Sequence, residues 1–354
     1  MRIVVLGGDG IGPEVTAEGV RVLWAVANAA GMELDVTELP WGTGWYLEHR
    51  EMMPKDALDR LREFDAIYLG AVGSPAVPDH ITLREMLLQI RFGFHQYVNL
   101  RPVRLLRGVA SPLAEAPVVD IVFVRENSEG EYAGLGDRLF PGTGDEVALQ
   151  TAVFSRRGVE RIIRWAFEYA RARGRRRVTS VSKGNALNYS AVLWDDVFTE
   201  MAKDYPDIES DSVLVDAAAM YLITEPERFD VVVASNLFAD ILTEVGAALQ
   251  GGLGLAASAN LNPSREFPSM FEPVHGSAPS IAGHGVANPV GAIWSISLLL
   301  DHLGYDREAA AVLEAIEQVL EERRFLTPDL GGSSTTSDVG LAIADRVAGV
   351  LMSA

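Results

Sequence analysis

The sequence contains no cysteine, which excludes a disulfide framework, thiol catalysis and a thiolate metal site. Positive charge is also scarce, because 49 acidic residues outweigh 30 basic ones and leave a formal net charge of −19. This excess of negative charge argues against nucleic acid or an anionic membrane as a partner. The longest apolar run, residues 292–300, ends at Asp301 and falls far short of the roughly 20 residues that a membrane span needs.

Lysine is rare among the basic residues, since only Lys55, Lys183 and Lys203 interrupt a set that is otherwise arginine. A lysine can lose its proton near neutral pH when its surroundings lower its pKa, whereas an arginine cannot. We therefore treat an isolated lysine as a candidate for proton transfer.

What the chain does contain is ordinary globular composition, with 354 residues, 48% hydrophobic and 22% charged, which is enough for two domains. Residues 1–6 already have the composition of a strand and leave no room for a signal peptide, so we expect a cytoplasmic location. Strand patterns alternate with helical patterns throughout, which predicts an α/β fold. The glycine-rich segment 132–145 is expected to be an irregular arm or loop. Helices are expected at residues 13–30, 83–91, 159–170, 289–303, 306–323 and 338–352.

A glycine-rich turn at residues 7–12 follows the first predicted strand and could be taken for a dinucleotide-binding fingerprint. That fingerprint needs glycine at the sixth position of Gly-x-Gly-x-x-Gly. Counting from Gly8 or Gly10 puts Pro13 or Val15 there instead. The turn therefore does not predict a standard Rossmann site.

Acidic residues follow two predicted strands. Asp240 and Glu244 stand one helical turn apart after the strand at residues 230–234, so their carboxylates share one face of a helix. Asp216 ends the β-branched segment 213–215, and ligands of open α/β sheets bind at such strand ends. Three carboxylates are hard oxygen ligands, which favours a divalent-metal site. The alternative is that Asp240 and Glu244 are solvated helix charges.

Three arginines, Arg91, Arg101 and Arg125, stand where predicted strands or helices end. Their guanidinium groups pair with carboxylates, so together they would fit a partner with more than one negative charge. If these arginines share a site with the acids, this set of side chains would suit the binding of a hydroxy di-acid together with a metal ion. Lys183 could then accept the hydroxyl proton and Tyr132 could supply a proton to carbon. Taken singly, each arginine could equally be a surface residue.

These residues lie in motifs that resemble the metal-dependent β-decarboxylating dehydrogenases of isocitrate and isopropylmalate, most closely the tartrate/D-malate dehydrogenase branch. The resemblance covers essentially the whole chain. It is carried by GDGIGPEV (8–15), IRFGFHQYVNLRP (90–102), VRENSEGEY (124–132), SVSKGNAL (180–187), SNLFADILTE (235–244) and EPVHGSAPSIAGHGVANP (272–289).

The resemblance implies an isopropylmalate-dehydrogenase-like two-domain α/β fold, with open sheets, flanking helices and a non-Rossmann dinucleotide site. Residues 1–99 plus 252–354 would form the larger, cofactor-binding domain. Residues 100–251 would form the smaller domain, which carries the dimer interface and the metal site.

The resemblance also implies the roles of individual residues. Tyr132 and Lys183 would be catalytic, and Mg²⁺ or Mn²⁺ would be held by Asp216, Asp240 and Glu244, with Lys183 and Asp216 coming from the partner subunit of a homodimer. The substrate would be bound by Arg91, Arg101, Arg125, Leu87, Leu88 and Asn185. NAD would lie along Ile11, Ser74, His275, Gly276, Ser277, Ala278, Ser280 and Asn288.

The chain departs from the family pattern at four places. Ala239 and Glu244 replace a glycine and an aspartate in the metal helix, which puts the affinity for metal in question. Ser280 replaces the aspartate that NAD-using members carry after Gly-Ser-Ala-Pro, and Ile281 does not fit the NADP-using pattern. Arg84 lies near the position that reads the variable group of the substrate, where it could bind a polar substituent or face solvent.

The predicted function is the NAD- and divalent-metal-dependent oxidative decarboxylation of a (2R)-hydroxy di-acid such as D-malate or tartrate. One alternative is 3-isopropylmalate dehydrogenase, in which Leu87 and Leu88 would pack the isopropyl group. Another is a non-catalytic regulatory homologue, which the altered metal helix and Ser280 would favour. The C3 substituent, a requirement for K⁺ and assembly beyond a dimer stay open.

Overall fold

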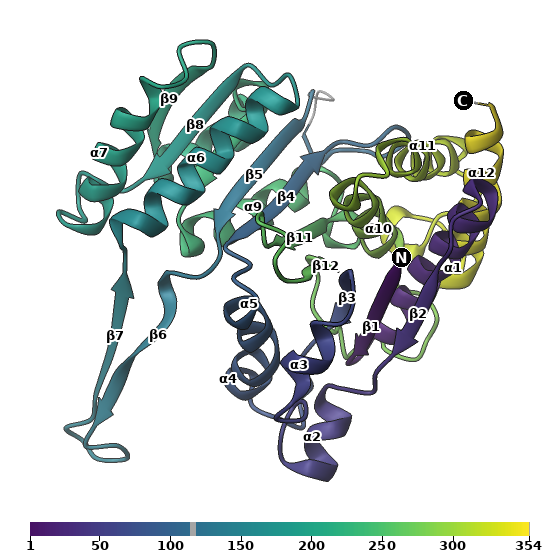
Figure 1. Ribbon diagram of the computed structural model, residues 1–354, viewed down its shortest axis with the longest axis horizontal. Coiled ribbons are helices and arrows are strands. Elements are labelled where there is room, and N and C mark those ends of the chain that lie inside the picture. The colour runs from purple at the N-terminus through teal and green to yellow at the C-terminus, as the bar shows by residue number, and fades with distance from the viewer. Residues whose placement is uncertain (114–117, 354) are drawn as a thin grey trace. The chain divides into compact units, whose positions relative to one another are not determined.

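The computed structural model describes residues 1–113 and 118–353, which Figure 1 shows as ribbons. The chain divides into two compact units. Unit 1 comprises Met1–Gln96, Arg104–Ala116 and Ala247–Ala354, and unit 2 comprises Tyr97–Val103 and Pro117–Gly246. Unit 1 is therefore built from both ends of the chain, and it also includes residues 104–113, which lie within the central range 100–251 of the sequence analysis.

Unit 1 contains five strands in the order β2-β1-β3-β12-β11. Neighbouring strands are parallel except for β11 and β12, which are antiparallel. Strands β3 and β12 are buried along their whole length because helices cover the sheet, which explains the continuous apolar sequence of β3. The strands are β1 (Arg2–Gly8), β2 (Asp35–Glu38), β3 (Ala66–Ala71), β11 (Ala257–Leu261) and β12 (Ser269–Pro273).

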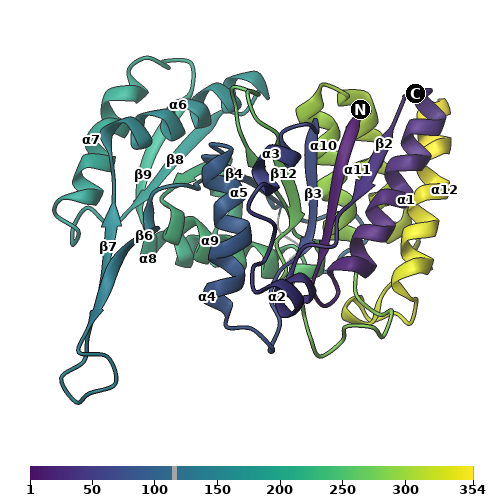
Figure 2. The same ribbon diagram turned by 60° about the horizontal axis from the view of Figure 1, so that its bottom comes forward.

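The helices of unit 1 include a pair from opposite ends of the chain, α1 (Gly12–Ala30) and α12 (Thr336–Ser353), which lie side by side in Figures 1 and 2. Helix α1 has a proline in its first turn, and Gly31, which follows its last residue, is in the left-handed conformation. The predicted helix 83–91 is a π-helical turn (Leu83–Leu88) that continues into α5. The others are α2 (Thr43–His49), α3 (Ala57–Leu61), α4 (Asp79–Thr82), α5 (Gln89–Gly93), α10 (Val290–Leu303) and α11 (Asp306–Glu322).

The main-sheet strands of unit 2 run in the order β4-β5-β10-β8-β9, with β5, β10, β8 and β9 parallel. Helix α6 packs on these strands with an apolar stripe that is fully buried, which confirms the predicted core face. The strands are β4 (Val98–Arg104), β5 (Asp120–Glu126), β8 (Arg177–Ser182), β9 (Glu209–Leu214) and β10 (Val231–Ala234). The helices are α6 (Arg156–Ala172), α7 (Ser190–Ala202), α8 (Val215–Thr224) and α9 (Asn236–Leu249).

A two-stranded antiparallel ribbon extends from unit 2 and is formed by β6 (Gly130–Leu139) and β7 (Val147–Val153) (Figure 1). The expectation of an irregular arm or loop at residues 132–145 was therefore right about an arm and wrong about the irregular backbone, because residues 132–139 belong to β6. Both faces of the ribbon are largely exposed, so neither strand has the alternating burial that marks a strand in sequence. None of the helices in the described part of the chain has the length and apolar composition that crossing a membrane would require.

Candidate active site

Three parallel strands of unit 2 end at one edge of the sheet and place the candidate residues there. In the register of the sheet Ala234 at the end of β10 lies between Arg125 on β5 and Val181 on β8. Lys183 follows β8 directly, and α9 begins two residues after Ala234. The carboxyl ends of parallel strands are where open α/β sheets bind ligands, so this edge is the candidate active site.

Asp240, in the second turn of α9, is the centre of this site. Its Oδ1 atom accepts a hydrogen bond from Nη1 of Arg125 and forms an ion pair with Nη1 of Arg101 at 3.2 Å. Its Oδ2 atom accepts a hydrogen bond from the Tyr132 hydroxyl at 2.9 Å. The side chains of Arg101 and Arg125 are 8% and 3% exposed, whereas that of Asp240 is 32% exposed. Two buried positive charges therefore converge on one carboxylate that remains open to solvent.

The guanidinium groups are fixed by neutral side chains that the sequence analysis did not assign to the site. Asn236 accepts hydrogen bonds from Arg125 Nε at 3.0 Å and Nη2 at 2.7 Å. Asn99 accepts one from Arg101 Nε at 2.7 Å, and Thr243 accepts one from Arg101 Nη1 at 2.6 Å. The signal for Thr243 was its place one turn after Asp240 on the same helix face. The neutral partners orient the arginines without neutralising them.

Tyr132 lies at the base of the ribbon and is held in the site by two contacts. Its hydroxyl donates to Asp240, and its ring lies 5.6 Å from the guanidinium carbon of Arg125. Burial raises the pKa of Tyr132, and the neighbouring Asp240 carboxylate raises it further. The hydroxyl therefore keeps its proton at neutral pH, which is the state that a proton donor requires.

The remaining acids are divided between two places in unit 2. Glu244 shares helix α9 with Asp240, and loss of part of its hydration raises the pKa of its carboxyl, with Arg101 opposing this shift. Asp216 lies in the first turn of α8, where it accepts a hydrogen bond from Lys183 Nζ at 2.6 Å. That hydrogen bond lowers the pKa of Asp216. Among the described residues no group of three His, Cys, Asp or Glu side chains is placed to hold a metal ion.

Arg91, on α5 of unit 1, is buried against an acid of its own unit. Its Nη2 donates to Glu272 at 2.8 Å, and Asn260 donates to the same carboxylate oxygen at 2.7 Å. Its Nε atom is buried and has no hydrogen-bond partner among the described residues. One side of this guanidinium is thus left available to an acceptor.

The other residues assigned to substrate differ in exposure. Leu88 is 4% exposed and belongs to the buried core of unit 1, while Leu87 is partly buried against that core. Asn185 and Arg84 are both exposed. Leu87 therefore presents more accessible surface to a ligand than Leu88 does.

The cofactor segment assigned from the sequence is joined to the glycine-rich turn of unit 1. The Ile11 N–H donates to the carbonyl of Ser277 at 2.9 Å. Gly10 has a φ of +59°, and a Cβ atom there would stand 1.9 Å from that carbonyl oxygen, so only glycine fits. The N–H groups of Asp9 and Gly12 are also used, by Ala71 and Asp9. These three donors are not free to cradle a pyrophosphate, in agreement with the prediction of a non-Rossmann site.

His275, in the same segment, has a buried ring nitrogen without a hydrogen-bond partner among the described residues. Its Nδ1 atom lies 3.0 Å from the carbonyl oxygen of Gly276, which can only accept, so Nδ1 bears the proton in the neutral ring. Burial lowers the pKa of His275 and keeps the ring neutral. Its Nε2 atom is then a buried acceptor without a partner among the described residues. An adjacent ligand with a hydrogen-bond donor would satisfy it, and the residues present therefore fit a bound nucleotide.

The last three predicted cofactor residues vary in their surroundings. Asn288 donates to Asp329 at 3.0 Å and accepts from the Val290 N–H at 3.0 Å, at the start of α10. Ser74 caps a short turn by accepting from the Ala76 N–H. Ser280 is exposed.

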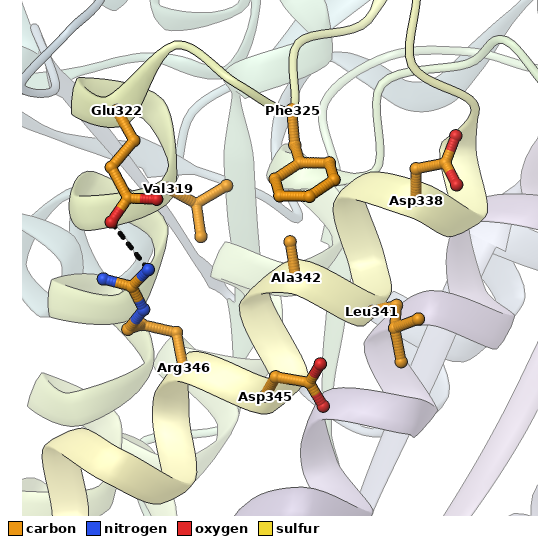
Figure 3. A pocket seen from close by; sticks show the side chains of 8 residues that line it. All are labelled: Val319, Glu322, Phe325, Asp338, Leu341, Ala342, Asp345 and Arg346. Carbon is orange, nitrogen blue, oxygen red and sulfur yellow. Dashed lines mark hydrogen bonds and ion pairs between the residues drawn. The ribbon is translucent and has the colours of Figure 1, made fainter.

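A separate cavity of about 270 Å³ lies between α11 and α12 in unit 1 (Figure 3). Its lining includes the ion pair between Arg346 and Glu322, 2.6 Å apart, and the apolar side chains of Phe325 and Leu341. None of the residues singled out from the sequence lines it. We assign it no part in the candidate active site.

Comparison with known proteins places these residues in context. The model of the isocitrate/isopropylmalate dehydrogenase family matches residues 2–343. The chain is 48% identical to a probable tartrate dehydrogenase/decarboxylase of Bacillus subtilis, over 98% of each chain. It is 50% identical to the 3-isopropylmalate dehydrogenase of Thermobifida fusca, over 98% of each. It is also 50% identical to the decarboxylating D-malate dehydrogenase of Escherichia coli, over 97% of each.

The fold has a close counterpart among solved structures. The crystal structure of isocitrate dehydrogenase from Methylococcus capsulatus superposes with a TM-score of 0.89 and is 36% identical in sequence. The match covers 98% of this chain and 99% of the other.

Proposed function

Because the chain belongs to the isocitrate/isopropylmalate dehydrogenase family, we propose that it oxidatively decarboxylates a (2R)-hydroxy di-acid such as D-malate or tartrate. NAD and a divalent ion, Mg²⁺ or Mn²⁺, are the proposed cofactors. The names of the Bacillus subtilis and Escherichia coli relatives support this class of substrate.

The observation that carries the proposal is the arrangement around Asp240. Two buried guanidinium groups and a protonated phenol surround a single carboxylate at the ligand-binding edge of a parallel sheet. Asp240 and Glu244, which interacts with both arginines, supply negative charge for a cation, and Arg101 and Arg125 supply positive charge for an anionic substrate. Arg101 and Arg125 would bind carboxylates of the di-acid, and Arg91 would contribute as the resemblance implies.

The proposed chemistry assigns one proton transfer to each catalytic residue. When bound, the divalent ion would polarise the C2 hydroxyl and stabilise the negative charge that follows decarboxylation, while NAD would accept the hydride. Lys183, as the free amine, would remove the hydroxyl proton. Tyr132 would then give its proton to C3, which its raised pKa suits.

We further propose that each metal site is shared between two chains of a homodimer. Asp240 and Glu244 supply two carboxylates, and the third would come from Asp216 of the partner subunit. Within one chain Asp216 pairs with Lys183, and the described residues place no three acids around one point. Exposed apolar side chains on the two helices that carry these acids support an interface, namely Met220 and Ile223 on α8 and Ile241 on α9.

NAD is proposed over NADP because the segment that would hold the adenosine carries no lysine or arginine between residues 272 and 289. A 2′-phosphate is recognised through such cations. Ser280 supplies a hydroxyl where an acid would bind the ribose more tightly.

The test is the formation of NADH, followed by absorbance, with Mn²⁺ and a panel of D-malate, tartrate, 3-isopropylmalate and isocitrate. We expect the highest kcat/KM with D-malate or tartrate, and a lower one with NADP than with NAD. A higher kcat/KM for 3-isopropylmalate would assign the second candidate, which the Thermobifida fusca relative favours. No turnover with any of the four would refute the proposal.

A further inference from the structure

The loop that follows β12, residues 278–288, is tied to the rest of unit 1 by side chains from two distant helices. Glu14, in the first turn of α1, accepts hydrogen bonds from the N–H groups of Gly283 and, at 3.1 Å, of Gly285. Thr336, the first residue of α12, donates its N–H to the Gly285 carbonyl at 2.8 Å and its hydroxyl to the Ala287 carbonyl at 2.7 Å.

Of these two ties, the one made by Glu14 is the stronger. A carboxylate that accepts from backbone N–H groups makes charge-assisted hydrogen bonds, which are roughly twice as strong as neutral ones. Both oxygens of Glu14 are used, one for each glycine. The N-terminal end of α1 also stabilises the negative charge of a residue in its first turn.

The loop depends on this tie because its own hydrogen bonds are few. Within it, Ile281 donates to the Ala278 carbonyl at 3.1 Å and His284 to the Ile281 carbonyl at 3.2 Å, and both are local turns. Gly283 and Gly285 have φ values of +77° and +66°, which lie in the left-handed region that glycine adopts more readily than other residues. Two flexible glycines would gain many conformations if the carboxylate that binds both N–H groups were removed.

We propose that Glu14 is a positioning residue for NAD, which holds the 278–288 loop in the conformation that receives the cofactor. The inference rests on the proposed function in one respect only, the assignment of this loop to NAD. The unpartnered Nε2 of His275, just before the loop, is the observation that fits a nucleotide there. Glu14 touches no residue assigned to proton transfer, so its loss should weaken cofactor binding and leave the chemical steps intact.

The experiment compares Glu14→Ala, Glu14→Asp and wild type, with Glu48→Ala as a control. Glu48 is an exposed acid on α2, also in unit 1, and no hydrogen bond of its side chain occurs among the described residues. The first readout is hydrogen exchange of peptides that cover residues 280–287, measured by mass spectrometry without any ligand. The second is the Kd for NAD by calorimetry, and the third is the division between KM and kcat.

In Glu14→Ala we expect exchange in the loop to accelerate by about tenfold or more, because two charge-assisted hydrogen bonds are lost. The Kd and KM for NAD should rise about tenfold, since only a fraction of the molecules would hold the competent loop. The kcat at saturating NAD and the KM for the hydroxy acid should stay within about twofold. Glu14→Asp should lie between wild type and Glu14→Ala, because its shorter side chain keeps the charge but reaches less far.

An unchanged Kd for NAD in Glu14→Ala would overturn the proposal, as would a fall in kcat with no change in that Kd. Unchanged exchange in the loop would overturn it too. The first two readouts need no substrate, so they separate this inference from the proposed function. A wild-type protein that binds NAD but oxidises none of the hydroxy acids refutes the proposed function and leaves the inference on Glu14 standing.

Discussion

The two candidate regions of this protein differ in whether their polar groups already have partners within the protein. In unit 2 the Asp240 carboxylate is already bound by Arg125, Arg101 and Tyr132, so an incoming ion or di-acid must exchange partners with groups that are satisfied. In unit 1 the His275 Nε2 atom has no partner among the described residues, and a ligand would simply add one.

This difference has an energetic consequence. Removing one member of the Asp240 cluster leaves buried charge uncompensated, so stability and function should fall together. Removing a contact in unit 1 should weaken binding of the cofactor while the fold persists. The two regions should therefore respond differently to substitution.

The largest effect is expected from Lys183→Met, which removes the proposed base. General acid–base catalysis contributes about 10²–10⁴-fold, so kcat should fall by about 10³-fold or more. Steady-state kinetics should show the KM for the hydroxy acid within about tenfold of wild type. Lys203→Met, which alters an exposed lysine of the same unit, should retain wild-type kcat. Full activity of Lys183→Met would remove Lys183 from the mechanism.

Asp240→Asn should destabilise unit 2, because Arg101 and Arg125 would both lose the carboxylate with which they form ion pairs. We expect a loss of about 2–3 kcal/mol in the free energy of unfolding by urea, less than for a fully buried pair since Asp240 is 32% exposed. Mn²⁺ should raise the Tm of wild type but not of this variant. Asp204→Asn, an exposed change in the same unit, is the control. Equal stabilisation of both variants by Mn²⁺ would argue against Asp240 as a ligand.

Acidification should destabilise unit 1 more than unit 2. Burial lowers the pKa of His302 in unit 1 to about 4. Between pH 6.5 and 4 this side chain is therefore protonated in the unfolded chain and neutral in the folded chain. The folded state therefore loses about 2 kcal/mol by pH 5. In unit 2 burial raises the pKa of Glu126, so its carboxyl favours the folded state more as the pH falls.

Hydrogen exchange at pH 7 and pH 5, corrected for intrinsic rates, should therefore show unit 1 losing protection before unit 2. A His302→Asn variant should lose less of its protection in unit 1 over the same interval. Earlier loss in unit 2 of the wild type would contradict the assignment of these pKa shifts.

The smallest effect is expected at Ser280, which is exposed and lies near the start of the 278–288 loop. Ser280→Asp should lower kcat/KM for NADP relative to NAD by about tenfold, because an added carboxylate repels a 2′-phosphate. Ser280→Asn has nearly the same shape without the charge and should change the ratio little. An equal response of both variants would mean that shape and not charge acts at this position.

The sequence predicted most of the regular structure because its signals are local. The β-branched run at 231–234 and the apolar stripe of α6 follow directly from burial between layers. The ribbon β6–β7 could not be predicted in this way, since it buries neither face. Asp216 was expected at a strand end, and it lies one residue into α8, because β9 stops at Leu214.

The site was predictable only in part for a related reason. Arg101, Arg125, Tyr132 and Asp240 were assigned by residue type and motif, and the structure brings all four together. Asn236, which orients Arg125, lies 111 residues from it in sequence, so no local pattern indicates this hydrogen bond. Asn99 lies only two residues from Arg101, but a short polar side chain on a strand is by itself no sign of a binding site. Whether Asp216 contributes to a metal site of its own chain or of the partner subunit depends on how two chains pack together, and local sequence patterns carry no information about that packing.

The central claim, that two chains complete each metal site, is tested most directly by mixing Asp216→Asn with Glu244→Gln. Each variant alone should be inactive, because both sites of its homodimer lack a ligand. After unfolding and refolding together, half of the dimers should be mixed, and each of these should hold one intact site, so about a quarter of the wild-type activity should return. Native mass spectrometry would establish that mixed dimers form. Mixed dimers without any recovered activity would contradict a shared site.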